Sequence, residues 1–359
     1  MSASWLPPSG ERIDVGILGA TGVVGQQFVA LLADHPWFRV TWLAASERSA
    51  GQRYGDLAWR LPKRQPEDVA ALRVSSLDKI SEAPSLLFSG LDSSVAGEAE
   101  LAFAASGRHV ISNAKNHRMD PLVPLLIPEV NPDHLALLDY QRRARGWTGS
   151  LVTNPNCATI VVAMVLGALR QFQPGRILVT TMQALSGAGY PGVASLDALG
   201  NVIPYIGGGE EEKIETEPRK ILGRFEGGRF VDADFTVSAS VHRVAVTDGH
   251  TMAAFFRFGK KKPSAEEAAR ILAEFRGEPQ ERKLPSAPER PVHVLDGADR
   301  PQPRLDRDRE HGMAVSVGRV RTDAIFDLRL EALVHNTIRG AAGAAILNAE
   351  LMHARGLLQ

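Results

Sequence analysis

The chain has 359 residues, which is more than a single hydrophobic core usually supports, so we expect two domains. Its 41 Lys and Arg residues equal its 41 Asp and Glu residues, and this balance argues against a nucleic-acid binder or a protein of anionic membrane surfaces. Because a single cysteine excludes an internal disulfide, and neither a signal-peptide pattern nor a membrane-spanning apolar stretch is visible, we predict a cytoplasmic protein that acts on small molecules.

Residues 13–36, IDVGILGATGVVGQQFVALLADHP, begin with a β-type run, turn through glycines and continue with helical spacing of apolar residues. Strand, glycine turn and helix follow one another in this order in dinucleotide-binding units. Gly19 and Gly22 let the main chain approach a pyrophosphate, Gly25 lets helix and strand pack closely, and the helix N-terminus offers free N–H groups. The alternative is a glycine-rich turn that only packs, but its place between strand and helix favours a dinucleotide site.

The next strand, residues 38–46, is expected to end near the ribose of that dinucleotide, where NAD enzymes commonly carry an acidic residue. Arg48 and Ser49 follow instead, and guanidinium and hydroxyl donors suit a 2'-phosphate. Glu47 keeps NAD as an alternative cofactor. A second alternative is that this stretch is a solvated charged loop without a ligand contact. We predict NADP as the cofactor, and no metal site.

Two further stretches, 85–94 and 108–114, have the character of sheet strands that end in Ser, Gly or Asn. Up to about residue 150 the alternation of strands and helices is that of a doubly wound α/β sheet. In such folds the site lies beyond the carboxyl ends of the strands.

The only cysteine, Cys157, ends the stretch TNPNC and precedes an apolar run, 158–172, that is long enough for a buried helix. Asn154 or Asn156 can cap this helix. Cys157 would then lie at the helix start, where the helix field and free N–H groups favour a thiolate, so we predict a depressed thiol pKa. The alternative is a small buried hydrophobic residue, which is the commoner state of a lone cysteine.

Residues 240–255, SVHRVAVTDGHTMAAF, offer partners for a thiolate nucleophile. Arg243 lies in a predicted strand and presents a forked donor that suits a carboxylate. A turn at 247–249 delivers His250, and histidine is the side chain best matched to proton transfer near neutral pH. His242 is a rival for the same role, and the alternation of this stretch does not decide between the two.

Three later stretches add candidates. Gln183 precedes a flexible loop, 186–189, whose glycines let the main chain lie against a flat ring. Glu210 and Lys213 stand at the start of an acidic and basic helix, for which a solvated face is the simpler explanation. The segment 285–312 is rich in proline and charge, and we predict a long irregular excursion that covers a site or an interface.

The motifs of the chain resemble those of the aspartate-semialdehyde dehydrogenase family, in the branch common in archaea and fungi. The resemblance runs through nearly the whole length. It rests on GATGVVGQ (19–26), ASERSAG (45–51), SNAKNHRMD (112–120), PLLIPEVN (124–131), TNPNCAT (153–159), MQALSGAGYPG (182–192), GEEEK (209–213), RVAVTDGH (243–250), RPQPRLDRD (300–308) and HNTIRGAAGAAILNAE (335–350). Ala245 departs from the commonest pattern, in which proline follows Arg-Val, and we expect no effect on the chemistry.

The resemblance implies an enzyme of aspartate-family amino-acid biosynthesis (lysine, threonine and methionine) that reduces L-4-aspartyl phosphate with NADPH to L-aspartate 4-semialdehyde and phosphate, reversibly. Cys157 would form a thioester, His250 would be the acid/base, and Gln183 would orient the acyl group. The substrate-binding positions implied by the resemblance are Arg243, Glu210, Lys213, Arg118, Asn156 and Asn113. The cofactor-binding positions are Gly19, Thr21, Gly22, Val23, Gly25, Arg48, Ser49, Ser186, Gly187 and Asn336.

The resemblance also implies two domains: a Rossmann-type doubly wound NADP-binding domain and an α+β catalytic and dimerisation domain with a mixed sheet. Residues 1–156 would form the first domain, to which a C-terminal helix within 338–359 returns, and residues 157–337 the second. A homo-oligomer, either dimer or tetramer, is expected.

Three other functions remain in view. A malonyl-CoA reductase-like enzyme also forms a thioester but needs room for CoA, and the charged residues Glu210, Arg243 and Arg118 favour an amino-acid substrate over it. An N-acetyl-glutamyl-phosphate reductase fits TNPNC and QALSGAG less well. A non-catalytic NADP-binding sensor would leave Cys157 and His250 without a purpose.

Overall fold

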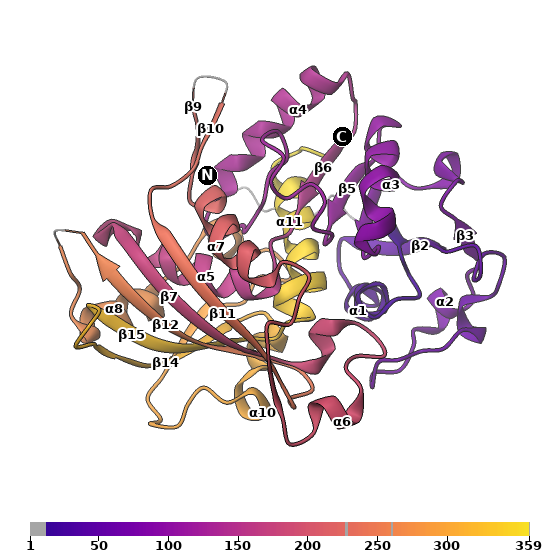
Figure 1. The fold of residues 1–359 in the computed structure, drawn as a ribbon. Coiled ribbons are helices and arrows are strands. Elements are labelled where there is room, and N and C mark those ends of the chain that lie inside the picture. Colours follow the sequence, from indigo (N-terminus) through magenta and orange to yellow (C-terminus); the bar gives the residue numbers. More distant parts are fainter. Residues whose placement is uncertain (1–11, 227–228, 260, 359) are drawn as a thin grey trace.

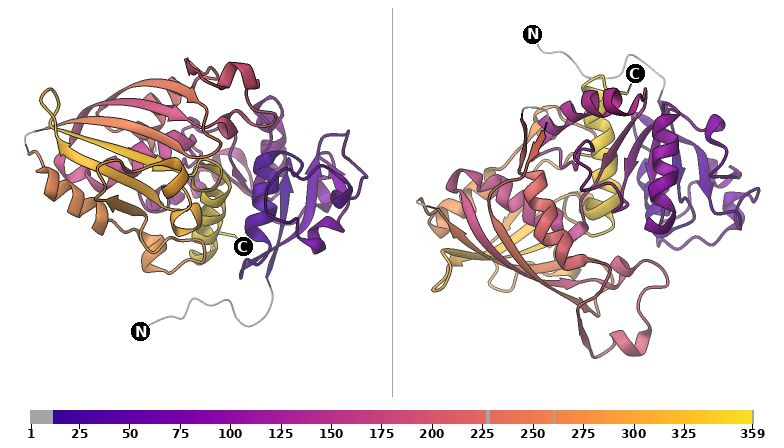
Figure 2. Two further views of the ribbon diagram at one scale, coloured as in Figure 1. Left: turned by 90° about the horizontal axis from the view of Figure 1, so that it is seen from below. Right: turned by 45° about the horizontal axis from the view of Figure 1, so that its top comes forward.

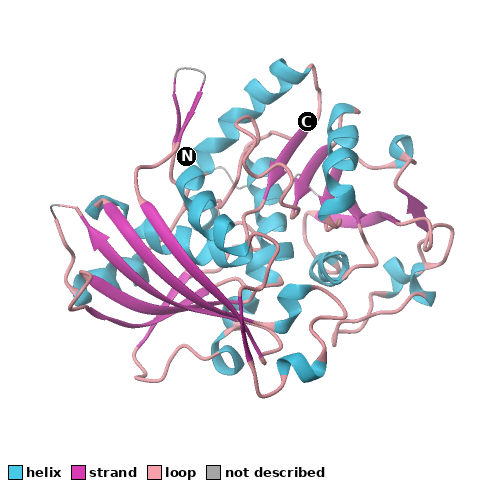
Figure 3. Cartoon of the chain, in the orientation of Figure 1, coloured by secondary structure: helices cyan, strands magenta, loops and turns pink. Residues whose placement is uncertain are grey.

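Two sheets organise the chain, one built mainly from the first half of the sequence and one from the second (Figure 1). A computed structural model describes residues 12–226, 229–259 and 261–358. Figure 3 shows helices between the two sheets, so a helical layer separates the first sheet from the second. No helix in these ranges is long and apolar enough to cross a membrane.

The first sheet has six strands, all parallel, as the predicted doubly wound pattern requires. In spatial order they are β3 (Val74–Ser76), β2 (Phe38–Ala45), β1 (Ile13–Leu18), β4 (Leu86–Ser89), β5 (His109–Ser112) and β6 (Ser150–Thr153). Helices α1 (Val23–Leu32), α2 (Glu67–Ala70), α3 (Ser93–Ala105) and α4 (Leu137–Arg145) belong to this half. Strands β4, β5 and β6 are buried along their whole length because helices cover both faces of the sheet.

The C-terminal helix α11 (Gly343–Ala354) contributes most of its buried apolar side chains to a core of this first sheet, and Ala344 to the core of the second half of the chain. Its Ile346 and Leu347 share one apolar core with Phe28 of α1 and Val15 of β1. The opposite face of the sheet is covered by α3 through Phe103. Both views of Figure 2 show α11 between the two sheets.

The second sheet is mixed and has seven strands. In spatial order they are β13 (Val292–Leu295), β14 (Val315–Thr322), β15 (Leu328–Val334), β12 (His250–Phe258), β7 (Pro174–Gln183), β11 (Thr236–Val244) and β8 (Val202–Pro204). Three helices pack on one face of this sheet: α5 (Cys157–Ala168), α7 (Glu210–Ile221) and α8 (Ala265–Glu274). The second half also contains three short helices, α6 (Ser195–Ala198), α9 (Glu278–Glu281) and α10 (Pro303–Asp306). Strands β9 (Arg224–Glu226) and β10 (Arg229–Val231) form a separate hairpin.

Alternation along the central strands explains why this sheet has one core face. Residues of β11 and β12 alternate between buried and partly exposed positions, as expected of strands with one covered face. The buried side joins α5 and α7 in a single core that includes Ile160 and Ile214. The outer side carries Leu178, whose side chain is exposed.

Two expectations about the second half need correction. The segment 285–312 is not irregular throughout, because Val292–Leu295 pairs in parallel with β14 and extends the sheet, and Pro303–Asp306 is a helical turn. The strand that carries Arg243 ends at Val244, so residues 245–246 belong to the loop before His250 rather than to the strand, while 247–249 form the predicted turn.

Lys220 joins α7 to a loop of the first half of the chain. Its ammonium group donates to the main-chain oxygens of Arg118, Asp120 and Val123 at 2.5, 2.7 and 2.8 Å, and its side chain is buried. Burial lowers the pKa of Lys220 to about 8, which leaves the ammonium form dominant at pH 7. The three N–H groups of the ammonium therefore satisfy three main-chain oxygens of this loop.

We expect Lys220→Met to lower the free energy of unfolding by about 2–4 kcal/mol, because three buried carbonyls lose their partner together. Urea unfolding followed by circular dichroism measures this. Lys262→Met is the matched control, since the Lys262 side chain is exposed and makes one ion pair, with Asp327, whose loss should cost less than about 1 kcal/mol. Equal losses in the two variants would contradict the role given to Lys220.

Candidate active site

A cleft of about 1030 Å³ lies between the two halves of the chain, at the carboxyl ends of the parallel strands. This volume is at the upper end of the range for ligand sites. Most of the predicted site residues line it, namely Gly19, Thr21, Gly22, Val23, Asn113, Arg118, Asn156, Cys157, Ser186, Gly187, Glu210, Lys213 and Asn336. In the ranges that the structure describes, no group of three or more His, Cys, Asp and Glu side chains is arranged to hold a metal ion.

The glycine turn after β1 forms the floor of one end of the cleft. Gly19 has φ +75°, and a Cβ there would lie 2.8 Å from the main-chain oxygen of Gly90. A Cβ at Gly25 would lie 2.2 Å from the oxygen of Gly19, so Gly25 serves the close packing of α1 rather than lining the cleft. The hydroxyl group of Tyr54 donates a hydrogen bond to the main-chain oxygen of Ala20 at 2.7 Å and so holds the turn in place. The main chain is therefore held where a pyrophosphate can approach α1.

The ribose end of the cleft differs from the prediction in detail. Ser46 and Glu47 line it, together with Ser76 and Asp78 of the neighbouring strand end. Arg48 is exposed and, like Ser49, is not among the lining residues. A contact of Arg48 with a 2'-phosphate therefore requires its side chain to swing over the ligand, and the contact stays a prediction.

Cys157 is the first residue of α5, as predicted. Asn156 caps the helix, because its Oδ1 accepts from the N–H groups of Ala158 at 2.9 Å and Thr159 at 3.3 Å. A Cβ at Gly340 would lie 2.6 Å from the Cβ of Cys157, so Cys157 packs directly on a π-helical turn, Ile338–Ala342. Glycine at position 340 is what allows this close approach.

Asn154, the other candidate cap, has a different function. Its Nδ2 donates to Oδ1 of Asn113 at 2.8 Å and to the oxygen of Ala341 at 2.9 Å. Its Oδ1 accepts from Asn348 of α11 at 2.6 Å. Asn154 thus joins the strand ends of the first sheet to the C-terminal helix.

The prediction of a depressed thiol pKa is wrong for this structure. Burial raises the pKa of Cys157 to about 12, and the carboxylate of Glu210 raises it further. Arg118, the N–H of Ala158 and Lys213 act in the opposite direction and are outweighed. The helix start does stabilise a thiolate, but desolvation is the larger effect.

Arg243, Gln183 and His250 come together at the ends of three neighbouring strands. Arg243 of β11 pairs in register with Gln183 of β7, and His250 begins β12. A Cβ at Gly187 would lie 2.9 Å from both Nη1 of Arg243 and Cε1 of His250, so the flexible loop touches both side chains. His242 is excluded as the rival base because it lies on the other side of β11 and pairs with the oxygen of Thr181.

The hydrogen bonds of His250 define which ring nitrogen carries the proton. Nδ1 accepts from the N–H of Ala184 at 3.0 Å, so the neutral ring is protonated on Nε2. Among the described residues, neither Nε2 of His250 nor Nε2 of Gln183 has a hydrogen-bond partner, although both are buried. Burial lowers the pKa of His250 to about 3, and the neighbouring Arg243 lowers it further, so the ring is neutral at pH 7.

Asn336 connects the loops that carry these residues. Its Oδ1 accepts from the N–H of Gly249 at 2.8 Å, and its Nδ2 donates to Oγ of Ser186 at 2.8 Å. The Asn336 side chain thereby fixes the residue before His250 against the loop that contains Gly187. It lines the cleft as well, so a cofactor contact and this bridging function are compatible.

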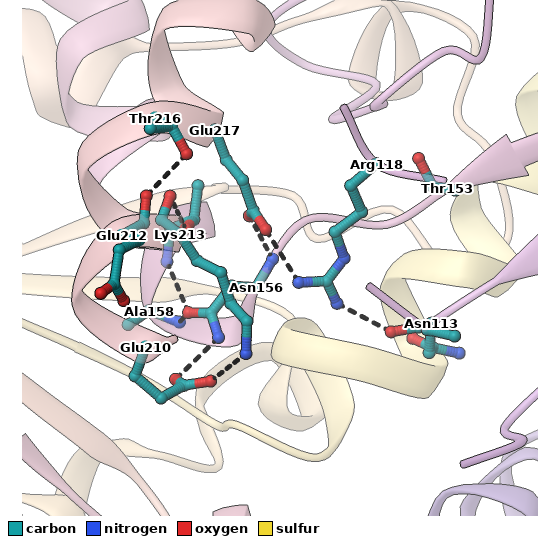
Figure 4. A network of polar contacts seen from close by, with 12 residues as sticks. Asn113, Arg118, Thr153, Asn156, Ala158, Glu210, Glu212, Lys213, Thr216 and Glu217 are labelled. Carbon is teal, nitrogen blue, oxygen red and sulfur yellow. Dashed lines mark hydrogen bonds and ion pairs between the residues drawn. The ribbon is translucent and has the colours of Figure 1, made fainter. Parts of the chain in front are cut away.

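Charged side chains of α7 surround the cap of α5 (Figure 4). Glu210 accepts from Lys213 at 2.6 Å and from Nδ2 of Asn156 at 2.8 Å. Glu217, which the sequence analysis missed, accepts from Nη1 of Arg118 at 2.9 Å and from the main-chain N–H of Asn156 at 2.7 Å. The signal for Glu217 was present, because it lies seven residues after Glu210, two helical turns along the same face.

We expect Glu210→Gln to accelerate alkylation of Cys157 by iodoacetamide at pH 8, because Glu210 raises the thiol pKa and the thiolate is the reactive form. Lowering the pKa from about 12 increases the thiolate fraction at every pH below it. Glu212→Gln is the control, since it removes the same charge from an exposed position on α7. Mass spectrometry of the single cysteine gives both rates, and equal rates would contradict the prediction.

Comparison with known proteins agrees with this geometry. Residues 14–138 match the NAD-binding domain of semialdehyde dehydrogenases, and residues 166–339 match their dimerisation domain. A dinucleotide cleft that ends at a cysteine on a helix start thus defines a nicotinamide-dependent dehydrogenase of the semialdehyde class.

The chain is 49% identical to the aspartate-semialdehyde dehydrogenase of Archaeoglobus fulgidus, over 95% of this chain and 98% of that one. It is 48% identical to that of Schizosaccharomyces pombe, over 96% and 99%. The crystal structure of the Candida albicans aspartate-semialdehyde dehydrogenase with NADP superposes with a TM-score of 0.88 at 41% identity, over 97% of this chain and 100% of that one. The chain belongs to the aspartate-semialdehyde dehydrogenase family, and archaeal and fungal relatives stand among its matches, as the motif pattern predicts.

Proposed function

We propose that the chain reduces L-4-aspartyl phosphate with NADPH to L-aspartate 4-semialdehyde and phosphate, and catalyses the reverse oxidation, in aspartate-family amino-acid biosynthesis. The observation that carries this proposal is that Cys157 and Glu210 line the dinucleotide cleft while Arg243 lies directly behind the lining residue Gly187, close enough to feel the charges of both. A forked cation suits the α-carboxylate of an amino acid and a carboxylate suits its amine. Malonyl-CoA has a carboxylate but no amine beside its reacting carbonyl, so Glu210 favours an amino-acid substrate over an acyl-CoA.

Chemistry begins at the sulfur of Cys157. The C–S bond forms as the C–O bond to phosphate breaks, and the thiol proton leaves with the phosphate. Bound NADPH supplies a hydride, and the thioester becomes a thiohemiacetal with one proton taken up. Collapse of the thiohemiacetal breaks the C–S bond, releases the aldehyde and restores the thiol.

His250 and Gln183 are proposed to meet the reacting carbonyl, because each has a buried donor without a partner in the described parts of the protein. Nε2–H of His250 is placed to donate to the oxygen that becomes negative in both tetrahedral states. A second proton on Nδ1 would face the N–H of Ala184, so the ring orientation favours the donor half of the predicted acid/base role. The amide of Gln183 orients the acyl group beside it.

The phosphate end is assigned to basic and amide groups on the opposite side of Cys157. Arg118, Lys213 and Asn156 would hold the phosphate, with Asn113 beside them. Arg118 is buried, and its Nε lacks a hydrogen-bond partner among the described residues. An anion in the cleft would complete the coordination of this guanidinium.

The glycine turn fits a dinucleotide, because Gly19, Gly22 and the start of α1 leave main-chain groups open to the cleft. NADP is the proposed cofactor. Thr21, Val23, Ser186, Gly187 and Asn336 would contact it, and Gly25 would act through packing. Arg48 and Ser49 keep their proposed contact with the 2'-phosphate.

The proposed domain division is 1–156, with 338–359 returning to it, and 157–337. We assign homodimer formation, or a tetramer built from dimers, to the second domain, whose outer sheet face and long connection carry the exposed apolar side chains Leu178, Leu196, Leu199 and Val202. A working thiol needs a reducing compartment, so we place the enzyme in the cytoplasm.

The test is the absorbance change of NADP reduction with purified protein and L-aspartate semialdehyde, with and without inorganic phosphate. We expect turnover that depends on both. A protein that binds NADPH but shows no phosphate-dependent turnover would refute the proposal, and activity with acyl-CoA substrates instead would assign it to the CoA-dependent reductases.

A further inference from the structure

One carboxylate of α7 contacts both the anion-binding arginine and the helix start that carries the nucleophile (Figure 4). Oε1 of Glu217 accepts from Nη1 of Arg118 at 2.9 Å, and Oε2 accepts from the main-chain N–H of Asn156 at 2.7 Å. Glu217 is 2% exposed and does not line the cleft. It therefore acts on the site only through its two neighbours.

The first neighbour, Arg118, is fixed by Glu217 in a particular orientation. Its Nη2 donates to the oxygen of Asn113 at 2.7 Å, and its own main-chain oxygen accepts from Lys220 at 2.5 Å. Nη1 and Nη2 each donate one of their two N–H groups in this way, and Nε has no partner among the described residues. Glu217 and Asn113 thus fix the plane of the guanidinium and the direction of its remaining N–H groups.

The second neighbour, Asn156, is held from three sides. Its N–H donates to Glu217, its Nδ2 donates to Glu210, and its Oδ1 caps the N–H groups that follow Cys157. The main-chain N–H of Asn156 lies outside the helix ladder, and within the described ranges Glu217 is the acceptor that satisfies it. The position of Cys157 along the axis of α5 therefore depends on Glu217.

We propose that Glu217 is a positioning residue, which holds the guanidinium of Arg118 and the sulfur of Cys157 at a fixed separation so that phosphate is aligned for attack and departure. This inference rests on the proposed function. A carboxylate is required because it presents two acceptors to two donors while neutralising the buried arginine. A glutamine at 217 keeps the shape but offers one acceptor and turns an N–H group toward a donor.

The test compares Glu217→Gln with Glu215→Gln. Glu215 is a matched control because it also accepts a main-chain N–H, that of Ala239, but on the sheet side of α7 away from the cleft. In phosphate-dependent NADP reduction we expect Glu217→Gln to raise KM for phosphate roughly tenfold and to lower kcat by roughly 10–100-fold, since small misplacements of reacting groups have effects of this size. The Kd for NADPH should stay unchanged, and Glu217→Asp should recover part of the loss in KM.

A second readout does not need turnover. The rate of iodoacetamide alkylation of Cys157 should fall in Glu217→Gln, because Arg118 favours the thiolate and would no longer be held near it, and inorganic phosphate should protect the variant less than the wild type. Glu215→Gln should alkylate like the wild type.

The outcomes separate the two proposals. If Glu217→Gln matches Glu215→Gln in KM for phosphate and in alkylation, and differs only in thermal stability, Glu217 is merely structural and the inference fails. If the wild type shows no phosphate-dependent turnover but Glu217→Gln still slows alkylation, the proposed function fails while Glu217 keeps its positioning role at the thiol.

Discussion

Cys157→Ser is expected to reduce phosphate-dependent NADP reduction by about 10⁴-fold or more, which is the size of loss seen when a covalent nucleophile is removed. The chain has one cysteine, so no second sulfur can take its place. A serine hydroxyl is smaller than the thiol and fits against Gly340, but it ionises far less readily and the buried surroundings disfavour its anion further. The Kd for NADPH should be unchanged, because the substitution leaves the glycine turn after β1 and the start of α1 intact.

Intact mass spectrometry provides the accompanying measurement. Wild-type protein mixed with NADP and L-aspartate semialdehyde in the absence of phosphate should carry an aspartyl adduct, and the serine variant should carry none. A variant that retained turnover within tenfold of the wild type would show that the reaction does not pass through sulfur.

The features that the sequence predicted correctly are those that depend on neighbours in the chain. The order of strand, glycine turn and helix at residues 13–36 is local, and Gly19 adopts the positive φ that a tight turn of this kind requires. The cap of α5 is also local, since Asn156 reaches N–H groups two and three residues ahead. Such patterns contain both the residue and its partner in one short stretch.

The features that the sequence could not show depend on groups that are distant in the chain. Glu217 meets Arg118 across 99 residues, and Lys220 meets the same loop across about 100, so neither pairing has a local pattern. The thiol pKa was wrong for a similar reason. The helix start is visible in the sequence, but burial and the carboxylate of Glu210 arise only when α7 packs on α5.

The charge balance at the sulfur also has a consequence for the proposed reaction. At pH 7 the thiol and the imidazole are both neutral in this structure, so the pair is not a preformed thiolate and imidazolium. If Glu210 receives the substrate amine, that amine neutralises the carboxylate that raises the thiol pKa. Substrate binding would then favour the reactive form of Cys157 at the moment it is needed.

The second large effect is expected at His250, and it distinguishes hydrogen-bond donation from full proton transfer. We expect His250→Ala to lower kcat by about 10³–10⁴-fold and His250→Gln by only about 10²-fold, because a glutamine amide can place an N–H donor near the position of Nε2. KM for the semialdehyde should change little, since the proposed contact of Arg243 is with the α-carboxylate at the other end of the substrate. Steady-state kinetics of both variants, with NADPH binding as the check on folding, measures the two losses.

The pH profile provides an independent criterion for the same group. Because the pKa of His250 is lowered to about 3, its protonation should leave no inflection in kcat between pH 6 and 8, and the ordinary histidine inflection near pH 6.5 should be missing. A glutamine variant as slow as the alanine variant, together with an inflection near pH 6.5 that disappears in both, would instead assign full proton transfer to the ring. In that case Nδ1 must release the N–H of Ala184 during turnover, and the ring orientation seen here would be only one of two that the enzyme uses.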